Sequence, residues 1–285
     1  MNPAPNAPSA ETSPTSPSPL KNPAEMYEQY FVPAMFKPWS NILLRRVTLL
    51  LGERVLDIAC GTGIVARQAA PWVGATGQVT ALDMNPAMLT VARQAPLTTG
   101  AVIQWQQGNA IDLPFADGVF DVTLCQHGLQ FIPDRAAALR EMRRVLAPGG
   151  RALVMVLQAL ALHPVFEALM TSVANQLSLP LSTVITPFAM SDVDALHDLF
   201  DKAGFKTVHI YPETCTMHFP NPQSFVPLAV ASSAAAIPAF AQLAAPERAA
   251  LVEAVRAEIE PILQKYRDAE KVSFPMFANV AVGTT

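Results

Sequence analysis

Two acidic residues, with a glycine-rich turn between them, are the residues whose spacing best indicates chemistry. Asp57 ends an apolar run, Gly61 and Gly63 follow, and Asp83 stands 20 residues after Gly63. Glycine adopts backbone angles closed to other residues, and it lets a bulky ligand approach the main chain. A helix that begins near Gly63 directs its free N–H groups back toward the strand end. The stretch therefore predicts a site for a nucleotide-like ligand.

Two kinds of ligand use such a turn. The pattern Gly61-x-Gly63-x-x-Ala66, followed by Asp83 as a ribose-binding acid, satisfies the loose dinucleotide fingerprint. Asp57 separates the alternatives, because a carboxylate at the turn repels the negative pyrophosphate of NAD. S-adenosylmethionine carries a positive sulfonium and a positive amino group, which the same acid attracts. The acid at the strand end therefore favours S-adenosylmethionine over NAD.

The stretch 56–63, Leu-Asp-Ile-Ala-Cys-Gly-Thr-Gly, closely resembles motif I of the class I S-adenosylmethionine-dependent methyltransferases. The resemblance extends to Asp-Met-Asn-Pro at 83–86 and to the Pro-Gly-Gly turn at 148–150, so it covers about residues 53–157. Within that family the chain is similar to the branch of ubiquinone- and menaquinone-pathway C-methyltransferases and natural-product enzymes. The resemblance implies S-adenosylmethionine as the cofactor and leaves the methyl acceptor open.

Motifs, strand ends and resemblance together predict the residues of the donor site. Asp83, at the carboxyl end of a strand, is placed to accept hydrogen bonds from both ribose hydroxyls. Asn109 stands where the family has an acid that accepts from the adenine amino group, and its amide oxygen can do the same. The leading helix of the family implies a tyrosine contact to the methionine end, for which Tyr27 and Tyr30 both qualify. The predicted cofactor-binding residues are Tyr27, Asp57, Gly61, Gly63, Asp83, Met84, Asn109, Ala110 and Gln126.

His127 is the predicted catalytic residue. It follows the fourth strand, where donor and acceptor should meet, and its usual pKa suits proton transfer at neutral pH. The alternative is a structural histidine that is hydrogen-bonded within the turn. A base is required only if the acceptor must lose a proton, because the sulfonium already activates the methyl group and the protein need only hold the reactants in line. The other histidines have no metal-ligand spacing with carboxylates, so no metal is predicted.

The expected fold is a doubly wound α/β protein, with a mostly parallel seven-stranded Rossmann-like sheet and a helical cap. We expect strands at 55–57, 78–82, 102–106, 120–125 and 151–156, then an antiparallel hairpin from 205–211, 214–219 and 272–282. Residues 1–22 should be a disordered tail, and 23–285 one methyltransferase domain. Within it we expect leading helices at 23–51, broken at Pro33 and Pro38, a cofactor-binding core at 53–157, a cap at 158–271 and the final strand at 272–283.

Composition limits the partners. The formal net charge is −4 and no Lys/Arg cluster suits phosphate binding, which argues against nucleic acid. Three cysteines cannot form a disulfide framework, so we expect a reduced protein. No apolar run reaches the length of a membrane span, and the amino terminus has no secretory signal. We therefore expect a cytoplasmic protein without stable membrane association. The expected partner is a small-molecule acceptor, and the sequence leaves a homodimer open.

The cap sequence predicts the character of the acceptor. Residues 154–200 contain neither arginine nor lysine, so an anionic acceptor would find no charged partner there. Apolar residues are frequent in the cap, and we expect some of them to line the crevice: Phe166, Met170, Phe188, Met190, Phe225 and Phe240. The prediction is methyl transfer to a small, neutral, largely apolar metabolite beside His127. The alternative is a protein that binds S-adenosylmethionine without methyl transfer, as a regulatory subunit or a cyclase or elimination catalyst.

Overall fold

A single seven-stranded sheet organises the computed structural model, which describes residues 22–96, 99–234 and 237–285. The strand order is β3-β2-β1-β4-β5-β7-β6, in which the first five strands are parallel and β7 is antiparallel to both β5 and β6. The predicted doubly wound fold is therefore confirmed, while the predicted tail lies outside the described residues apart from Asn22. The strands are β1 (Arg54–Ile58), β2 (Gln78–Asp83), β3 (Ile103–Gln107), β4 (Phe120–Gln126), β5 (Leu146–Leu157), β6 (Thr207–Pro220) and β7 (Lys271–Thr284).

Helices cover both faces of this sheet. Side chains alternate along a strand, so Val55 of β1 packs into one core, while its neighbour Leu56 packs into the other. The first core contains α2 (Lys37–Val47) and α3 (Ile64–Val73), and the second contains α5 (Arg135–Arg144) and α8 (Val193–Ala203). The helix α4 (Pro86–Gln94) connects β2 to β3. Burial on both faces explains the apolar runs of the central strands β1, β4 and β5, whereas the edge strand β3 is partly exposed.

Helix starts follow the capping side chains. The sequence alone indicates Asn85 as the cap of α4, Pro133 as the start of α5 and Ser191 as the cap of α8. Asn85 does cap α4, accepting a hydrogen bond at 2.9 Å from the backbone N–H two residues later, whereas the other two predicted starts are wrong. Asp134 and Asp192 cap these helices, each accepting a hydrogen bond from the backbone N–H three residues later. Aspartate is a strong cap, so the residue next to each predicted start determines the boundary.

The leading helices form one continuous segment rather than the interrupted turns we expected. After α1 (Pro23–Met26) the chain continues as the π-helix η1 (Tyr27–Phe36) and then as α2. The wide π turns contain Pro33, and Pro38 stands in the first turn of α2. The helix ends at Val47 and does not continue to residue 51, because Thr48 takes a left-handed conformation with φ of 49°.

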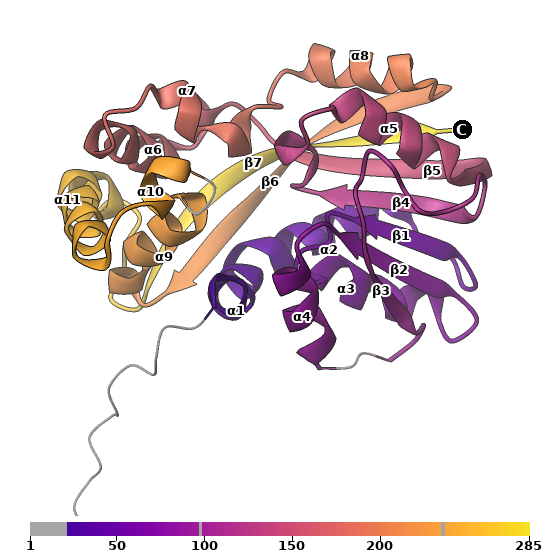
Figure 1. Cartoon of the computed structure of the whole chain (residues 1–285), viewed down its shortest axis with the longest axis horizontal. Coiled ribbons are helices and arrows are strands. Elements are labelled where there is room, and N and C mark those ends of the chain that lie inside the picture. The colour runs from indigo at the N-terminus through magenta and orange to yellow at the C-terminus, as the bar shows by residue number, and fades with distance from the viewer. Residues whose placement is uncertain (1–21, 97–98, 235–236) are drawn as a thin grey trace, which may run out of the picture.

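The cap helices gather around an extension of the sheet. β6 and β7 have 14 residues each and run past the other strands, and the helices surround their far end (Figure 1). The two predicted pieces of β6 are one strand, because Pro212 lies on the sheet edge, where a missing N–H is tolerated. Within the described ranges, no helix has the length and apolar character to cross a bilayer. The cap helices are α6 (Pro164–Gln176), α7 (Leu181–Val184), α9 (Pro222–Ala234), α10 (Pro238–Ala241) and α11 (Ala245–Leu263).

Candidate active site

A pocket of about 340 Å³ lies at the carboxyl ends of β1, β2 and β4, where ligands bind in sheets of this type. It brings together seven of the ten predicted site residues and leaves out Asp57, Gly63 and Gln126. Tyr27 lines the pocket, whereas Tyr30 does not. The lining residues are Tyr27, Ala59, Gly61, Leu82, Asp83, Met84, Asn85, Met88, Gly108, Asn109, Ala110, His127, Gly128, Phe131, Ile132 and Pro133.

Asp83 ties the glycine turn to the end of β2. One carboxylate oxygen accepts a hydrogen bond from the Gly61 N–H at 2.7 Å, and the other accepts from the Asn85 N–H at 2.8 Å. Burial raises the pKa of this carboxyl, while the backbone hydrogen bonds act in the opposite direction by stabilising its charged form. Each carboxylate oxygen has a second lone pair, so the side chain can still accept hydrogen bonds from a ligand in the pocket.

Tyr27 lies over the turn. Gly61 has φ of +56°, and a Cβ built on it would lie 3.7 Å from the tyrosine ring. The ring stacks on Phe36 of the same π-helix, with their centroids 4.7 Å apart. Burial and the nearby Asp83 raise the pKa of the Tyr27 phenol, so it stays protonated. The leading segment thus places a neutral hydrogen-bonding group directly at the pocket.

An ion pair holds this segment in place. Glu28 and Arg67 of α3 approach to 2.7 Å, and a second guanidinium nitrogen of Arg67 donates to the Thr62 carbonyl at 2.8 Å. Only 9% of Arg67 is exposed, so solvent screens the pair weakly. The π-helix is therefore fixed to the turn that it covers.

Two of the predicted donor residues, Asp57 and Gly63, lie behind the glycine turn and do not line this pocket. Asp57 does not line the pocket, and its carboxylate accepts a hydrogen bond at 3.0 Å from the Ala66 N–H in the first turn of α3. There its oxygen satisfies a backbone N–H at the N-terminus of α3. Gly63 is required for packing, since a Cβ there would lie 2.3 Å from the Trp105 ring. Asp57 and Gly63 therefore support the turn without lining the pocket.

Asp57 makes the stability of the fold depend on pH. Burial raises its pKa from the usual 3.8 to about 8, so the folded protein keeps a proton that the unfolded chain has released. The stabilisation that this retained proton gives the fold is complete below the usual pKa of aspartate. It is lost as the pH rises through the folded pKa of Asp57. Asp57→Asn cannot ionise, so its melting temperature should rise relative to wild type as the pH increases from about 4 to about 8.

Asp121→Asn is the matched control, because the pKa of Asp121 is shifted in the opposite direction. Its carboxylate bonds Arg54, which lowers the pKa of Asp121. The Asp121 variant should therefore be less stable than wild type at neutral pH, with a difference that shrinks in acid. Thermal unfolding across this pH range measures both effects. A constant difference between Asp57→Asn and wild type would contradict the assignment of a raised pKa to Asp57.

Polar side-chain atoms of Gln126 and Asn109 form hydrogen bonds with the protein's own backbone. The Gln126 amide donates to the Phe36 carbonyl at 3.0 Å and joins β4 to the leading segment, which explains why it is absent from the pocket. The Asn109 amide oxygen accepts from the Ile111 N–H at 3.2 Å, so it shapes its own loop while it lines the pocket. Apolar side chains complete the pocket mouth: Met84 is 66% exposed and Phe131 51% exposed.

His127 combines two costly features at the pocket. Its backbone is left-handed, with φ of 51°, and its side chain is only 7% exposed. The imidazole contacts Phe36 and Trp39 edge-on, at 6.1 and 5.8 Å between centroids, and neither ring nitrogen has a partner among the described residues. Burial lowers its pKa to about 3, so the ring is neutral. The alternative of a histidine hydrogen-bonded within the turn is therefore wrong for its side chain.

The sequence missed Trp39 as a neighbour of the site. It is fully buried in α2 and contacts His127 although 88 positions separate them in the chain. The aromatic run of the leading segment was the available signal, but it does not indicate which ring turns toward the pocket. The six predicted cap residues are all buried in the cores, and none lines the pocket. The expectation that the cap lines the crevice is therefore not met by this pocket.

Fold and site together define a class of protein. A doubly wound sheet has a left-handed glycine turn after its first strand and an acid at the end of its second, and both face one pocket. This is the arrangement of nucleotide-binding α/β proteins.

Comparison with known proteins identifies the family. The model of the ubiE/COQ5 methyltransferase family matches residues 33–219, and the chain belongs to that family. A 2-phytyl-1,4-naphtoquinone methyltransferase of Synechococcus elongatus is 41% identical over 41% of this chain and 51% of its own length. A ubiquinone/menaquinone biosynthesis C-methyltransferase of Haemophilus ducreyi is 34% identical over 61% of this chain and 72% of its own. The predicted class I S-adenosylmethionine-dependent methyltransferase family is therefore confirmed.

These matches have limits. The chain spans about half the length of the first of these relatives, 51%. A solved structure, phosphoethanolamine N-methyltransferase 2 of Haemonchus contortus in complex with S-adenosyl-L-methionine, matches with a TM-score of 0.55 and 19% identity over 92% of this chain and 56% of that one. At this identity the likeness shows the fold alone.

Proposed function

We propose that this protein transfers a methyl group from S-adenosylmethionine to a small, neutral ring acceptor of the quinol type. The observation that carries the proposal is the single pocket that holds Gly61, Asp83 and His127 in a chain of this family. The names of the relatives, which include naphthoquinone, ubiquinone and menaquinone, support the acceptor class.

The donor residues follow from the pocket. Asp83 would accept hydrogen bonds from the ribose hydroxyls, and the Gly61 backbone would pass closely beside the ligand. Met84 and Ala110 would pack against the adenine, with Asn109 at its edge. Tyr27, rather than Tyr30, would contact the methionine end. We keep Asp57, Gly63 and Gln126 as residues that shape the site without touching the donor.

The proposed reaction requires the protein mainly to hold the donor and the acceptor in the right positions. When bound, S-adenosylmethionine supplies a methyl group on a positive sulfur that leaves with the bonding electron pair. The chain orients the acceptor and excludes water from the reacting atoms. A pKa of about 3 makes the His127 imidazole a weak base at neutral pH. We therefore assign to His127 a neutral hydrogen bond to the acceptor, and the proton that the acceptor loses passes to water.

Turnover with a defined acceptor tests the proposal. The purified chain is incubated with S-adenosylmethionine and 1,4-dihydroxynaphthalene, and the release of S-adenosylhomocysteine is followed over time. We expect release that depends on the acceptor, together with a product heavier by one methylene. Binding of S-adenosylhomocysteine without turnover on any quinol of a panel would favour the alternative, a binding protein without methyl transfer. Tight binding of NAD would overturn the donor assignment.

A further inference from the structure

Three neighbouring side chains near the pocket carry buried polar atoms without a partner among the described residues. They are the Trp39 indole nitrogen, both imidazole nitrogens of His127 and the Gln126 amide oxygen. The three residues are linked: the Trp39 and His127 rings lie 5.8 Å apart, His127 follows Gln126, and both contact Phe36. Trp39 is fully buried, and His127 is 7% exposed.

Such a cluster is costly. A buried polar group without a hydrogen bond destabilises the folded protein, and buried polar groups are normally paired. The left-handed backbone of His127 adds strain at the same position. Packing alone would favour apolar rings here, because the surrounding residues are aromatic and aliphatic. Unpaired polar atoms and backbone strain in one place indicate groups that a ligand satisfies.

The atoms specify what that ligand must offer. An indole N–H only donates, an amide oxygen only accepts, and a neutral imidazole does one of each. The matching ligand therefore has an oxygen that accepts from Trp39 and a hydroxyl that donates to His127. The rings of Phe36 and Trp39 lie edge-on to His127, and an aromatic surrounding of this kind favours a planar ring.

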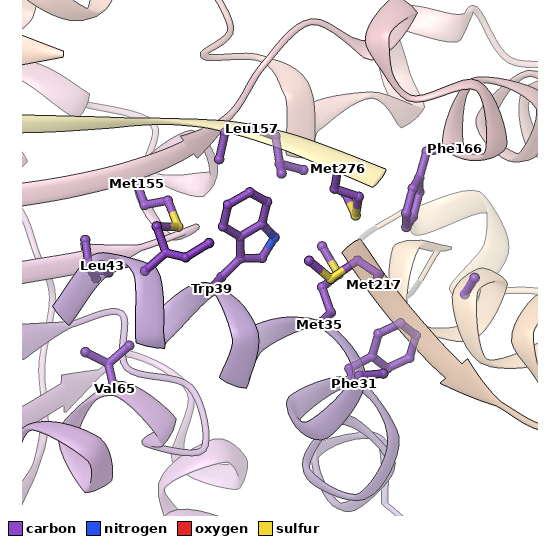
Figure 2. Close-up of a cluster of buried hydrophobic side chains, with 14 of the residues drawn as sticks. Phe31, Met35, Trp39, Leu43, Val65, Met155, Leu157, Phe166, Met217 and Met276 are labelled. Atoms are coloured by element: carbon purple, nitrogen blue, oxygen red, sulfur yellow. The ribbon is translucent and has the colours of Figure 1, made fainter. Parts of the chain in front are cut away.

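Trp39 has neighbours that can repack around such a ring. Its indole nitrogen points toward a group of methionines, Met35, Met217 and Met276, that come from η1, β6 and β7 (Figure 2). Methionine is unbranched and repacks readily around ligands. The site can therefore widen without unfolding any helix or strand.

We infer that Trp39 and His127 form an oxygen-recognition subsite, which selects acceptors that carry a hydroxyl on a planar ring. This inference rests on the proposed function and adds the residues that decide which acceptor binds. Trp39 donates to a ring oxygen, and the neutral His127 accepts from a ring hydroxyl. The Gln126 oxygen lies beside them as a further acceptor for a second hydroxyl.

Binding of two probes with the same carbon skeleton tests this inference. The full chain is saturated with S-adenosylhomocysteine and titrated with 1,4-dihydroxynaphthalene or with naphthalene, which lacks oxygen. Wild type should bind the dihydroxy probe more tightly. Trp39→Phe should weaken binding of that probe roughly tenfold and leave naphthalene unchanged, because it removes the donor and keeps a ring. Trp72→Phe, at a half-exposed position of α3, is the matched control and should change neither.

His127→Asn gives a second, independent measurement. Asparagine tolerates a left-handed backbone, so the variant keeps the turn, but its shorter side chain cannot reach the same hydroxyl. Its affinity for the dihydroxy probe should also fall about tenfold, while its affinity for S-adenosylhomocysteine is retained. If Trp39→Phe does not fold, this variant decides the matter.

The outcomes separate this inference from the proposed function. Equal binding of both probes by wild type, or variants that keep wild-type preference, would overturn the subsite. Methyl transfer to quinols with that preference unchanged would leave the proposed function intact while removing Trp39 and His127 as its specificity residues. Failure of S-adenosylhomocysteine to bind wild type would instead remove the proposed function itself.

Discussion

Replacing Gly63 by alanine should destabilise the fold by about 2–5 kcal/mol. The residue has φ of +84°, which costs an L-residue about 1–2 kcal/mol. A new Cβ would lie 2.3 and 2.4 Å from two carbons of the Trp105 ring, so the ring must move. Overpacking of this kind adds about 1–3 kcal/mol. The measurement is the free energy of unfolding in urea.

Gly149→Ala is the matched control. Its φ is +80°, close to that of Gly63, but a Cβ there would meet nothing within 4 Å. Its free energy of unfolding should fall only by the cost of a left-handed backbone, about 1–2 kcal/mol. The difference between the two variants isolates the contact between Gly63 and Trp105. Equal losses would mean that Trp105 does not restrict this turn and that Gly63 is needed for its backbone angles alone.

Asp83→Ala should weaken binding of S-adenosylhomocysteine by roughly 100-fold or more. The change removes a carboxylate that we place against two ribose hydroxyls, and hydrogen bonds to a charged group contribute about 1.5–3 kcal/mol each. It also frees the Gly61 N–H, which the carboxylate holds at 2.7 Å, so the turn loses its fixed position. Titration calorimetry with S-adenosylhomocysteine measures the loss.

Asp121→Ala serves as the control for this prediction. Asp121 also accepts a backbone N–H, that of Arg54 at 2.8 Å, but it does not line the pocket. Its loss should lower stability and leave the ligand affinity unchanged. If both variants lost affinity equally, the effect of Asp83 would be a general loss of structure. If Asp83→Ala bound as tightly as wild type, Asp83 would not contact the ribose.

The local signals in the sequence predicted the turn and its acids because both depend on short-range rules. Glycine at 61 and 63 takes left-handed angles, and Asn85 caps its helix through a bond two residues away. Strand ends bring Gly61, Asp83 and His127 to one edge of the sheet, since parallel strands end together. These expectations required only pattern and topology.

Those rules could not predict the direction in which individual side chains point. Asp57 and Asp83 occupy similar places at the ends of neighbouring strands, yet one bonds α3 and the other lines the pocket. Residue types do not separate them, because the outcome depends on how α3 packs against β1. The π-helix was also missed, since proline normally ends a helix and nothing local indicates the wider turn. The contact between Trp39 and His127 is set by tertiary packing.

Transfer of a labelled methyl group tests the central claim most directly. The purified chain is incubated with S-adenosylmethionine that carries a trideuteriomethyl group, with 1,4-dihydroxynaphthalene as acceptor, and the products are analysed by mass spectrometry. We predict an acceptor-derived product that carries the intact trideuteriomethyl group, formed in equal amount to S-adenosylhomocysteine. An acceptor that returns unlabelled, or altered without gaining the label, while the donor stays bound and intact would contradict methyl transfer by this protein.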